Sequence, residues 1–190
     1  MVARSSRERG LTLIELLVVI TVASVLAVIA LPDLAGFIKN NRSSADINDL
    51  LSSLTFARSE AVKRNSNVAI CQSGNGSSCE NSADARHNGW IVFEDRNLDG
   101  AIDTDADILT VHGGLAPNRQ LSFSADNVTY RSDGLATTGT NTTFKLCDDR
   151  GAEHAKGLII GASGRPRVAL DSSGNDIPED ADGDDLECGS

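Results

Sequence analysis

Residues 10–32 read GLTLIELLVVITVASVLAVIALP, an uninterrupted apolar stretch except for one acid. The 21 residues from 11 to 31 would extend about 31 Å as an α-helix, which matches the hydrocarbon core of a bilayer. Glu15 is the only charged residue among them. Because a carboxylate in hydrocarbon costs a few kcal/mol, its position predicts a helix that is held in a membrane and meets a partner there.

Two simpler explanations of this stretch remain open. A secretory signal peptide also joins a basic leader, here residues 1–10, to an apolar run, and Val28-Ile29-Ala30 resembles a small-residue cleavage site. The apolar run of a signal peptide usually has about 7 to 15 residues and no carboxylate, so Glu15 argues against this explanation. A plain single-pass anchor accounts for the length of the stretch but leaves Glu15 unexplained.

The order of Gly10, Leu11 and Glu15 resembles the hallmark of type IV pilins and type II secretion pseudopilins, although these more often have Phe where Leu11 stands. The resemblance implies that prepilin peptidase cleaves after Gly10 and that the new N-terminus is methylated. It implies a single-pass subunit in the inner membrane with a periplasmic C-terminal domain, which later joins a periplasmic or extracellular filament. There Glu15 pairs with the terminal amine of a neighbouring subunit, and Pro32 kinks the helix.

The charge of the chain restricts its partners. The formal net charge is -10 at pH 7, and removal of the leader, whose net charge is +2, leaves -12. Such an acidic protein is not generally attracted to nucleic acid or to anionic lipid, so any contact of this kind needs a local basic patch.

The chain has four cysteines, and all of them follow the membrane-targeting segment. An even number of cysteines in an oxidising compartment predicts disulfides, and their spacing lacks the close CxxC-like pairs of a structural zinc site. We favour bonds from Cys71 to Cys79 and from Cys147 to Cys188, because each closes a plausible loop. The other two connectivities remain open.

The remaining chain divides into a helical and a β-rich part. Beyond the leader (1–10) and the apolar helix (11–32), apolar residues recur at intervals of three and four over residues 33–64, which predicts an amphipathic continuation of the helix. Its predicted buried stripe consists of Leu34, Phe37, Ile38, Ile47, Leu50, Leu51, Leu54, Ala57 and Ala61.

Residues 65–190 are expected to form one β-rich periplasmic domain. Short runs rich in β-branched and aromatic residues predict strands at residues 67–72, 89–94, 108–112, 119–123, 128–131, 142–147, 157–162 and 167–170. The fold class is therefore α+β, with the long N-terminal helix packed against one or two antiparallel sheets. The acidic tail, residues 171–190, reads as a loop held mainly by Cys188.

Several short motifs, taken in order, resemble one branch of the pilin family, the GspH/FimT/FimU-like minor pilins. They are ARSEA at 57–61, VAIC at 68–71, GWIVF at 89–93, DRNLDG at 95–100, FKLC at 144–147 and GR at 164–165. The resemblance covers residues 11–168 and implies a type IV pilin-like fold. It also implies a low-abundance subunit that starts or caps a type IV pilus or a type II secretion pseudopilus, with other pilins or pseudopilins as partners.

One loop fits part of a calcium-binding pattern. Asp95, Asn97, Asp99, Gly100 and Asp103 occupy the first, third, fifth, sixth and ninth positions of such a loop. The twelfth position, which normally supplies a bidentate glutamate, is alanine, so affinity should be poor unless Asp105 or Asp107 substitutes. An acidic hairpin tip that only turns the chain explains the same residues, and no other cofactor is predicted.

The sequence GRPR at residues 164–167 is the main basic motif of the domain. Arg165 and Arg167 suit phosphate groups, because a planar guanidinium binds them through two hydrogen bonds. The motif also resembles the GRxR by which FimT-like pilins of natural transformation are thought to bind DNA. Three further basic residues could enlarge the patch: Lys145, Arg150 and Lys156. A solvated turn at a strand edge is the alternative.

Motifs of catalytic sites are missing from the sequence. Ser163 lies in GASGR, where a nucleophile elbow needs glycine instead of Arg165. The three histidines, His87, His112 and His154, have neither an HExxH nor a paired spacing and are expected at the surface or at strand ends. We therefore predict that the chain is not an enzyme and that Trp90 belongs to the core.

Overall fold

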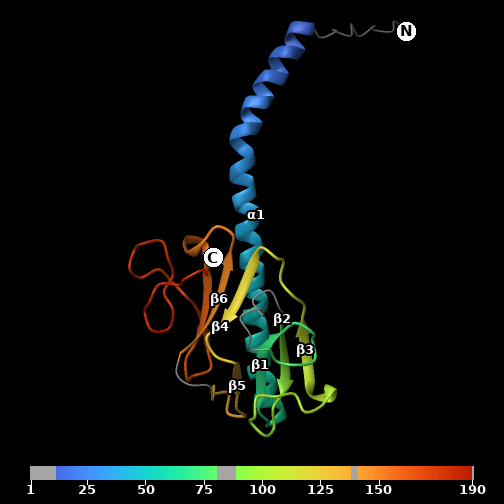
Figure 1. The fold of residues 1–190 in the computed structure, drawn as a ribbon, viewed down its shortest axis with the longest axis vertical. Coiled ribbons are helices and arrows are strands. Elements are labelled where there is room, and N and C mark those ends of the chain that lie inside the picture. The colour runs from blue at the N-terminus through green and yellow to red at the C-terminus, as the bar shows by residue number, and fades with distance from the viewer. Residues whose placement is uncertain (1–11, 81–88, 138–140, 190) are drawn as a thin grey trace, which may run out of the picture. The chain divides into compact units, whose positions relative to one another are not determined.

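The computed structural model describes residues 12–80, 89–137 and 141–189 (Figure 1), apart from the side chains of residues 28–33. Contacts divide the chain into two units, Met1–Asn41 and Arg42–Ser190. Among the described residues, no helical segment combines the length and apolar character that crossing a membrane requires.

Helix α1 (Leu13–Arg64) contributes to both units. The Thr12 hydroxyl accepts a hydrogen bond from the Glu15 amide at 3.3 Å, which satisfies one free donor of the first turn. The helix ends where Asn65 adopts φ 53° and the Ser66 amide bonds the carbonyl of Ala61. It is continuous across Pro32, whose side chain is outside the described part, so the kink stays a prediction.

The predicted buried stripe of α1 is correct only in its second half. Ile47, Leu50, Leu54, Ala57 and Ala61 are buried in the domain core, and Leu51 packs partly against it. By contrast, the three residues at the start of the predicted stripe are exposed: these are Leu34, Phe37 and Ile38. From residue 34 onward, the first buried residue of the helix is Ser43, so the domain core begins only there.

The strands of the described chain form two four-stranded antiparallel sheets, which confirms the α+β prediction. Sheet 1 has the order β3-β2-β1-β5 and sheet 2 the order β4-β6-β7-β8. The strands are β1 (Val68–Ser73), β2 (Gly89–Glu94), β3 (Ile108–His112), β4 (Arg119–Phe123), β5 (Asn127–Tyr130), β6 (Thr142–Asp148), β7 (Lys156–Ile160) and β8 (Pro166–Val168). Short 3-10 helices, Asp105–Asp107 and Ala152–His154, precede β3 and β7.

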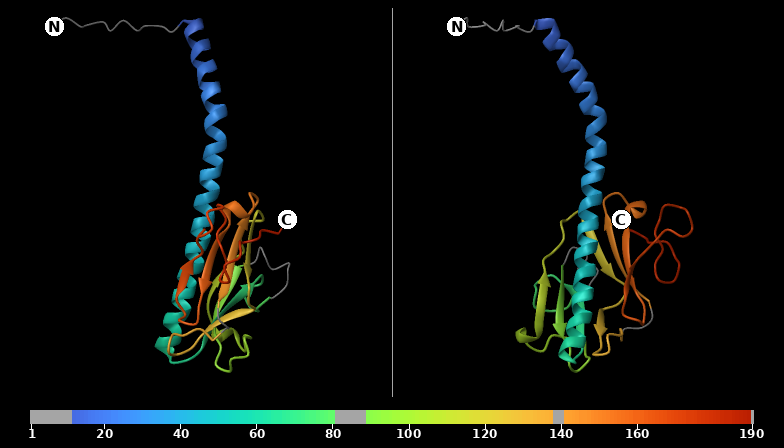
Figure 2. Two further views of the ribbon diagram at one scale, coloured as in Figure 1. Left: turned by 90° about the vertical axis from the view of Figure 1, so that its left-hand side faces the viewer. Right: turned by 180° about the vertical axis from the view of Figure 1, so that it is seen from behind.

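Both sheets pack on the second half of α1, and the main core lies between them (Figure 2). As predicted, Trp90 is part of this core, and its indole N–H donates to the Ser53 hydroxyl at 2.9 Å. His112 stacks on the Trp90 ring with centroids 3.8 Å apart, which places this histidine at the end of β3 against the core. The predicted position of His112 at a strand end is therefore correct.

Two smaller apolar clusters cover the outer faces of the sheets. On sheet 1, Phe93 and its neighbours pack against Ile102 and Cys79, which come from the loops after β2 and β1. On sheet 2, Ile159 packs with Leu186 of the tail. The central strands of the two sheets, β1 and β2 in sheet 1 and β6 and β7 in sheet 2, are thus buried on both faces.

The acidic tail is more ordered than predicted. Leu186 is buried, and the Glu179 carboxylate accepts hydrogen bonds from the amides of Ser172 and Ser173. The Glu179 amide donates to the carbonyl of Leu170 at 3.1 Å, so the tail covers the chain just after β8. Cys188 does tie the tail to β6, and these further contacts hold the tail as well. Strand β8 ends at Val168 instead of Leu170.

Candidate functional site

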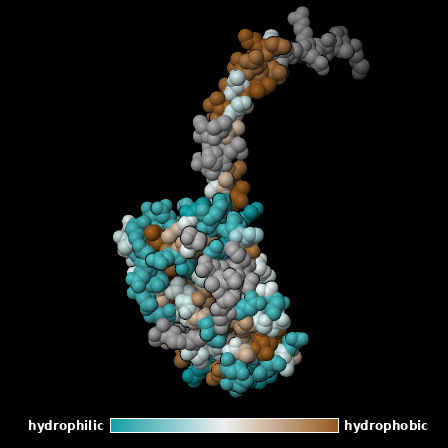
Figure 3. Space-filling view, viewed as in Figure 1, coloured by the Kyte–Doolittle hydropathy of each residue, from teal (hydrophilic) through white to brown (hydrophobic). Residues whose placement is uncertain are grey.

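The predicted assembly residues lie in the first unit. Gly10 and Leu11 are outside the described residues. Glu15 is exposed, and so is every other side chain of residues 12–27. Apolar side chains dominate this surface of α1 (Figure 3). The hydroxyl groups of Thr21 and Ser24 donate hydrogen bonds to main-chain carbonyls one turn earlier in the same helix. The surface of residues 12–27 therefore offers one charged group, the Glu15 carboxylate.

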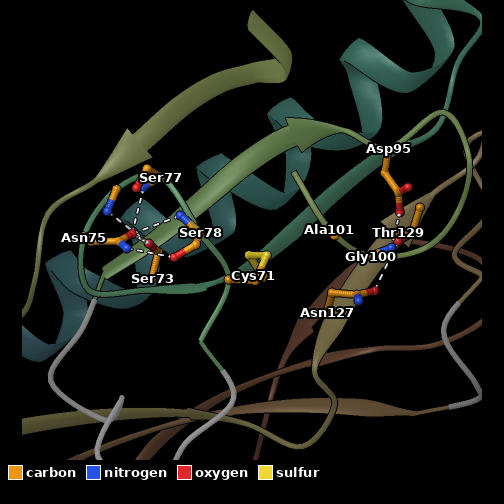
Figure 4. Close-up of a disulfide and its surroundings, with 12 residues drawn as sticks. Cys71, Ser73, Asn75, Ser77, Ser78, Asp95, Gly100, Ala101, Asn127 and Thr129 are labelled. Atoms are coloured by element: carbon orange, nitrogen blue, oxygen red, sulfur yellow. Dashed lines mark hydrogen bonds between the residues drawn. A yellow bond between two sulfur atoms is a disulfide. The ribbon is translucent and has the colours of Figure 1, made fainter. Parts of the chain in front are cut away.

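The two disulfides join Cys71 to Cys79 and Cys147 to Cys188, the favoured pairing. The Cα atoms of the pairs are 5.6 and 5.8 Å apart. The first bond closes the loop after β1 (Figure 4), and the second ties the tail to β6. Both bonds fix irregular segments on the outer faces of the sheets.

The predicted basic pair is exposed at the start of β8. Arg165 and Arg167 are both exposed, and within the described chain neither guanidinium has an ion-pair or hydrogen-bond partner. The turn before them is anchored by Arg58 of α1, which donates to the carbonyl of Gly134 at 2.9 Å and to that of Ser163 at 3.5 Å. Sequence reasoning missed Arg58, because its partners are far away in the chain.

The other basic residues do not extend this pair as predicted. The ammonium group of Lys145 donates a hydrogen bond to the main-chain carbonyl of Glu187 in the tail. Arg150 forms an ion pair with Asp148, and only 15% of the Arg150 side chain is exposed. Burial works to raise the pKa of Asp148, but the hydrogen bonds from Arg150 outweigh it and hold this pKa below its usual range. Two of the three candidate residues are therefore already engaged.

The Asp95 loop, residues 95–106, follows β2, includes the first two residues of the 3-10 helix Asp105–Asp107 and is built around a buried carboxylate (Figure 4). Asp95 is 2% exposed, and its Oδ2 accepts the amide N–H of Gly100 at 3.2 Å. Its Oδ1 is buried and has no hydrogen-bond partner among the described residues. Burial raises the pKa of Asp95 above its ordinary value.

Asn97 and Asp99, like Asp95, each accept a backbone amide further along the Asp95 loop through one side-chain oxygen. Asn97 Oδ1 accepts the amide of Asp99 at 3.3 Å, and Asp99 Oδ1 accepts the amide of Ala101 at 2.8 Å. The side-chain nitrogen of Asn97, Nδ2, donates to Asp99 Oδ2 at 2.8 Å and to Asp103 Oδ2 at 3.3 Å. Two carboxylates therefore converge on one polar nitrogen.

Asp107 cannot replace the missing glutamate of a calcium loop. The hydroxyl of Thr104 donates to its carboxylate at 2.8 Å, and Arg96 forms an ion pair with it at 3.0 Å. These contacts lower the pKa of Asp107, with the hydrogen bond from Thr104 as the largest cause. In the part of the chain that the structure describes, no three His, Cys, Asp or Glu side chains lie close enough to hold a metal ion together.

Comparison with known proteins identifies two matching family models. The model of the type II transport protein GspH matches residues 46–176, and that of the prokaryotic N-terminal methylation motif matches residues 5–31. A search of curated proteins finds no match to this chain.

Among solved structures, the chain is similar to the type IV minor pilin FimU of Pseudomonas aeruginosa. One crystal form is 22% identical with a TM-score of 0.53 and covers 76% of this chain and 98% of FimU. A second crystal form of FimU is 20% identical with a TM-score of 0.50, and the match covers 73% of this chain and 98% of FimU. The minor pseudopilin EpsH of the Vibrio cholerae type 2 secretion system is 12% identical, with a TM-score of 0.47 and coverage of 69% and 98%. The likeness to FimU supports the pilin-like fold, and because the GspH model matches more than half of the chain, this protein belongs to the GspH family.

Proposed function

We propose that this chain is a minor pilin or pseudopilin that works by assembly and not by catalysis. It is held in the inner membrane by residues 11–31 with the domain in the periplasm, and prepilin peptidase cleaves it after Gly10. It then joins a type IV pilus or a type II secretion pseudopilus, which it starts or caps. The observation that carries the proposal is the exposed apolar surface of residues 12–27 with Glu15 as its one charged group.

The chemistry of this surface asks for a second subunit. In lipid, the Glu15 carboxylate has no water to solvate it, and residues 12–27 of its own helix offer no cation. The terminal amine of a neighbouring processed subunit, which cleavage after Gly10 creates, would supply the missing positive charge. The apolar side chains around Glu15 would meanwhile exchange lipid for the helices of the filament.

Replacement of Glu15 tests this role. We expect Glu15→Ala to reduce the amount of the protein in sheared filaments by at least about tenfold, since about 1.4 kcal/mol of lost pairing has this effect on an equilibrium. Immunoblots of membranes and filaments from the same cells measure both pools. The matched control, Glu153→Ala, removes an exposed carboxylate from the 3-10 helix before β7. Equal filament levels in Glu15→Ala and wild type would refute the assembly role of this residue.

A second candidate function, DNA binding during uptake, is supported by one observation. Arg165 and Arg167 are exposed, two residues apart, and without an ion-pair partner in the described chain. The two guanidinium groups are therefore available to phosphates. With few phosphates contacted, such binding would be weak and would decrease steeply with salt.

The arginine pair separates the two functions. In low salt, we expect the full-length protein in detergent to raise the anisotropy of a labelled DNA duplex. Arg165→Ala/Arg167→Ala should remove this binding, whereas the control Arg42→Ala, which removes an exposed arginine of α1, should keep it. Absence of DNA binding by the wild type in low salt would leave assembly as the only function of the two.

A further inference from the structure

We propose that Leu98 is a contact residue for a neighbouring subunit, which receives its side chain in an apolar pocket bordered by basic residues. The inference rests on the proposed role in assembly and names one surface that this role would use. Leu98 lies in the Asp95 loop and is 54% exposed. The loop belongs to the domain, so this surface is distinct from residues 12–27 and from the arginine pair.

The backbone of Leu98 is unusual for its residue type. Its φ is 61°, in the left-handed region, where a residue with a bulky side chain is strained. The other non-glycine residues with positive φ in the described chain are Asn65, Asn141 and Asp176, whose side chains suit this region. Strain of this kind persists only where the surrounding structure enforces it, and it is concentrated at functional sites.

Hydrogen bonds on both sides of Leu98 enforce this conformation. Asn97 Oδ1 accepts the Asp99 amide at 3.3 Å, and Asn97 Nδ2 donates to Asp99 Oδ2 at 2.8 Å. The buried Asp95 carboxylate accepts the Gly100 amide at 3.2 Å (Figure 4). The turn therefore exposes the leucine side chain while its neighbours are bonded to one another.

The Asp95 loop is also fixed to the body of the domain. A Cβ at Gly100 would lie 2.3 Å from the Asn127 side chain, so the turn packs closely on β5. Ile102 packs on the outer apolar cluster of sheet 1. A rigid loop loses little conformational entropy on binding, so burial of Leu98 would contribute most of its apolar area to the stability of an interface.

The charges around Leu98 indicate the chemistry of the partner. The next basic residue in the sequence, Arg96, is already paired with Glu94 at 2.8 Å and with Asp107 at 3.0 Å. Three exposed carboxylates follow Leu98 in the loop: Asp99, Asp103 and Asp105. This acidic surface favours a partner with basic side chains around its pocket. The processed chain has a net charge of -12, which repels a second copy, so the partner is a subunit of another kind.

Replacement by asparagine separates binding from folding. Asparagine tolerates the left-handed region but has no apolar side chain, so Leu98→Asn should keep or raise the melting temperature of the full-length protein in detergent. The same variant should reduce the amount of this protein in sheared filaments by at least about fivefold. The matched control Leu170→Asn removes a leucine that is 68% exposed outside the loop, and it should keep the wild-type level.

Charge reversal tests the basic border of the pocket. Asp103→Lys should reduce the filament level by at least about threefold, because it places a positive charge opposite the basic side chains of the partner. The control Glu153→Lys reverses an exposed charge in the 3-10 helix before β7 and should assemble like the wild type. Equal filament levels of these two variants would overturn the match of acidic and basic surfaces.

A photoreactive benzophenone amino acid in place of Leu98 identifies the partner. In assembled filaments, we expect a crosslink to a different pilin-like subunit, at a segment with Lys or Arg that mass spectrometry locates. A crosslink only to a second copy of this chain, or only to proteins outside the filament, would overturn the proposal. So would equal filament levels of Leu98→Asn and Leu170→Asn. Absence of the wild type from filaments would instead refute the assembly role itself, and this inference with it.

Discussion

At the scale of single residues, Gly164 shows how packing can fix a motif independently of any ligand. It has φ 70°, and a Cβ there would lie 2.5 Å from the Gly134 carbonyl oxygen and 3.1 Å from Tyr130 Cε1. Arg58 bonds the same carbonyl and that of Ser163. The glycine of GRPR is thus required by the backbone of two neighbouring loops. Only the arginines that follow are open to solvent and to partners.

Gly164→Ala should lower the free energy of unfolding by about 1–3 kcal/mol, because it combines a strained left-handed alanine with a backbone clash. Gly161→Ala is the matched control, since a Cβ at Gly161 meets nothing within 4 Å and its φ is not left-handed. The control should stay within about 0.5 kcal/mol of wild type. Urea unfolding followed by circular dichroism measures both. Equal stability of the two variants would contradict the close packing of this turn.

At the scale of elements, the helix and the strands could be predicted from local patterns. The three- and four-residue spacing placed the buried face of α1 from Ile47 onward, and β-branched runs located β1 and β2 within a residue of their observed ends. These two strands lack an alternating pattern because both of their faces are buried. The loops and the tail that cover the second faces carry no periodic signal, so their packing could not be predicted.

The candidate sites were predictable only where the chemistry lies in one segment. The Asp95 loop and the arginine pair are local motifs, and the structure places each as a continuous unit. Arg58 and Gly134 are 76 positions apart in the sequence, and Lys145 lies 42 from Glu187, so neither contact leaves a short-range signal. Whether a basic residue is free or engaged depends on such distant partners, and a single sequence does not contain them.

At the scale of the whole molecule, the carboxyl groups fall into two classes with opposite effects on stability. Burial raises the pKa of Asp46 and of Asp95, so their ionised forms oppose folding. The pKa of Asp148, Asp107 and Glu179 is lowered by hydrogen bonds that outweigh burial, so their ionised forms favour folding. The net charge of -12 after removal of the leader adds general repulsion at neutral pH.

Stability should therefore pass through a maximum in mild acid. A raised folded pKa means that the native state takes up protons first, so protonation of Asp46 and Asp95 stabilises it as the pH falls through their raised pKa values towards the unfolded value of about 3.9. A lowered folded pKa means that the contribution of Asp148 is complete above the unfolded value of about 3.9 and is lost as the pH falls through the lower, folded value. Melting temperatures in calcium-free buffers between pH 7 and 3 measure the profile. Asp46→Asn should flatten its rise more than the exposed control Asp126→Asn, and a melting temperature that falls steadily from pH 7 would contradict the assignment of the two classes.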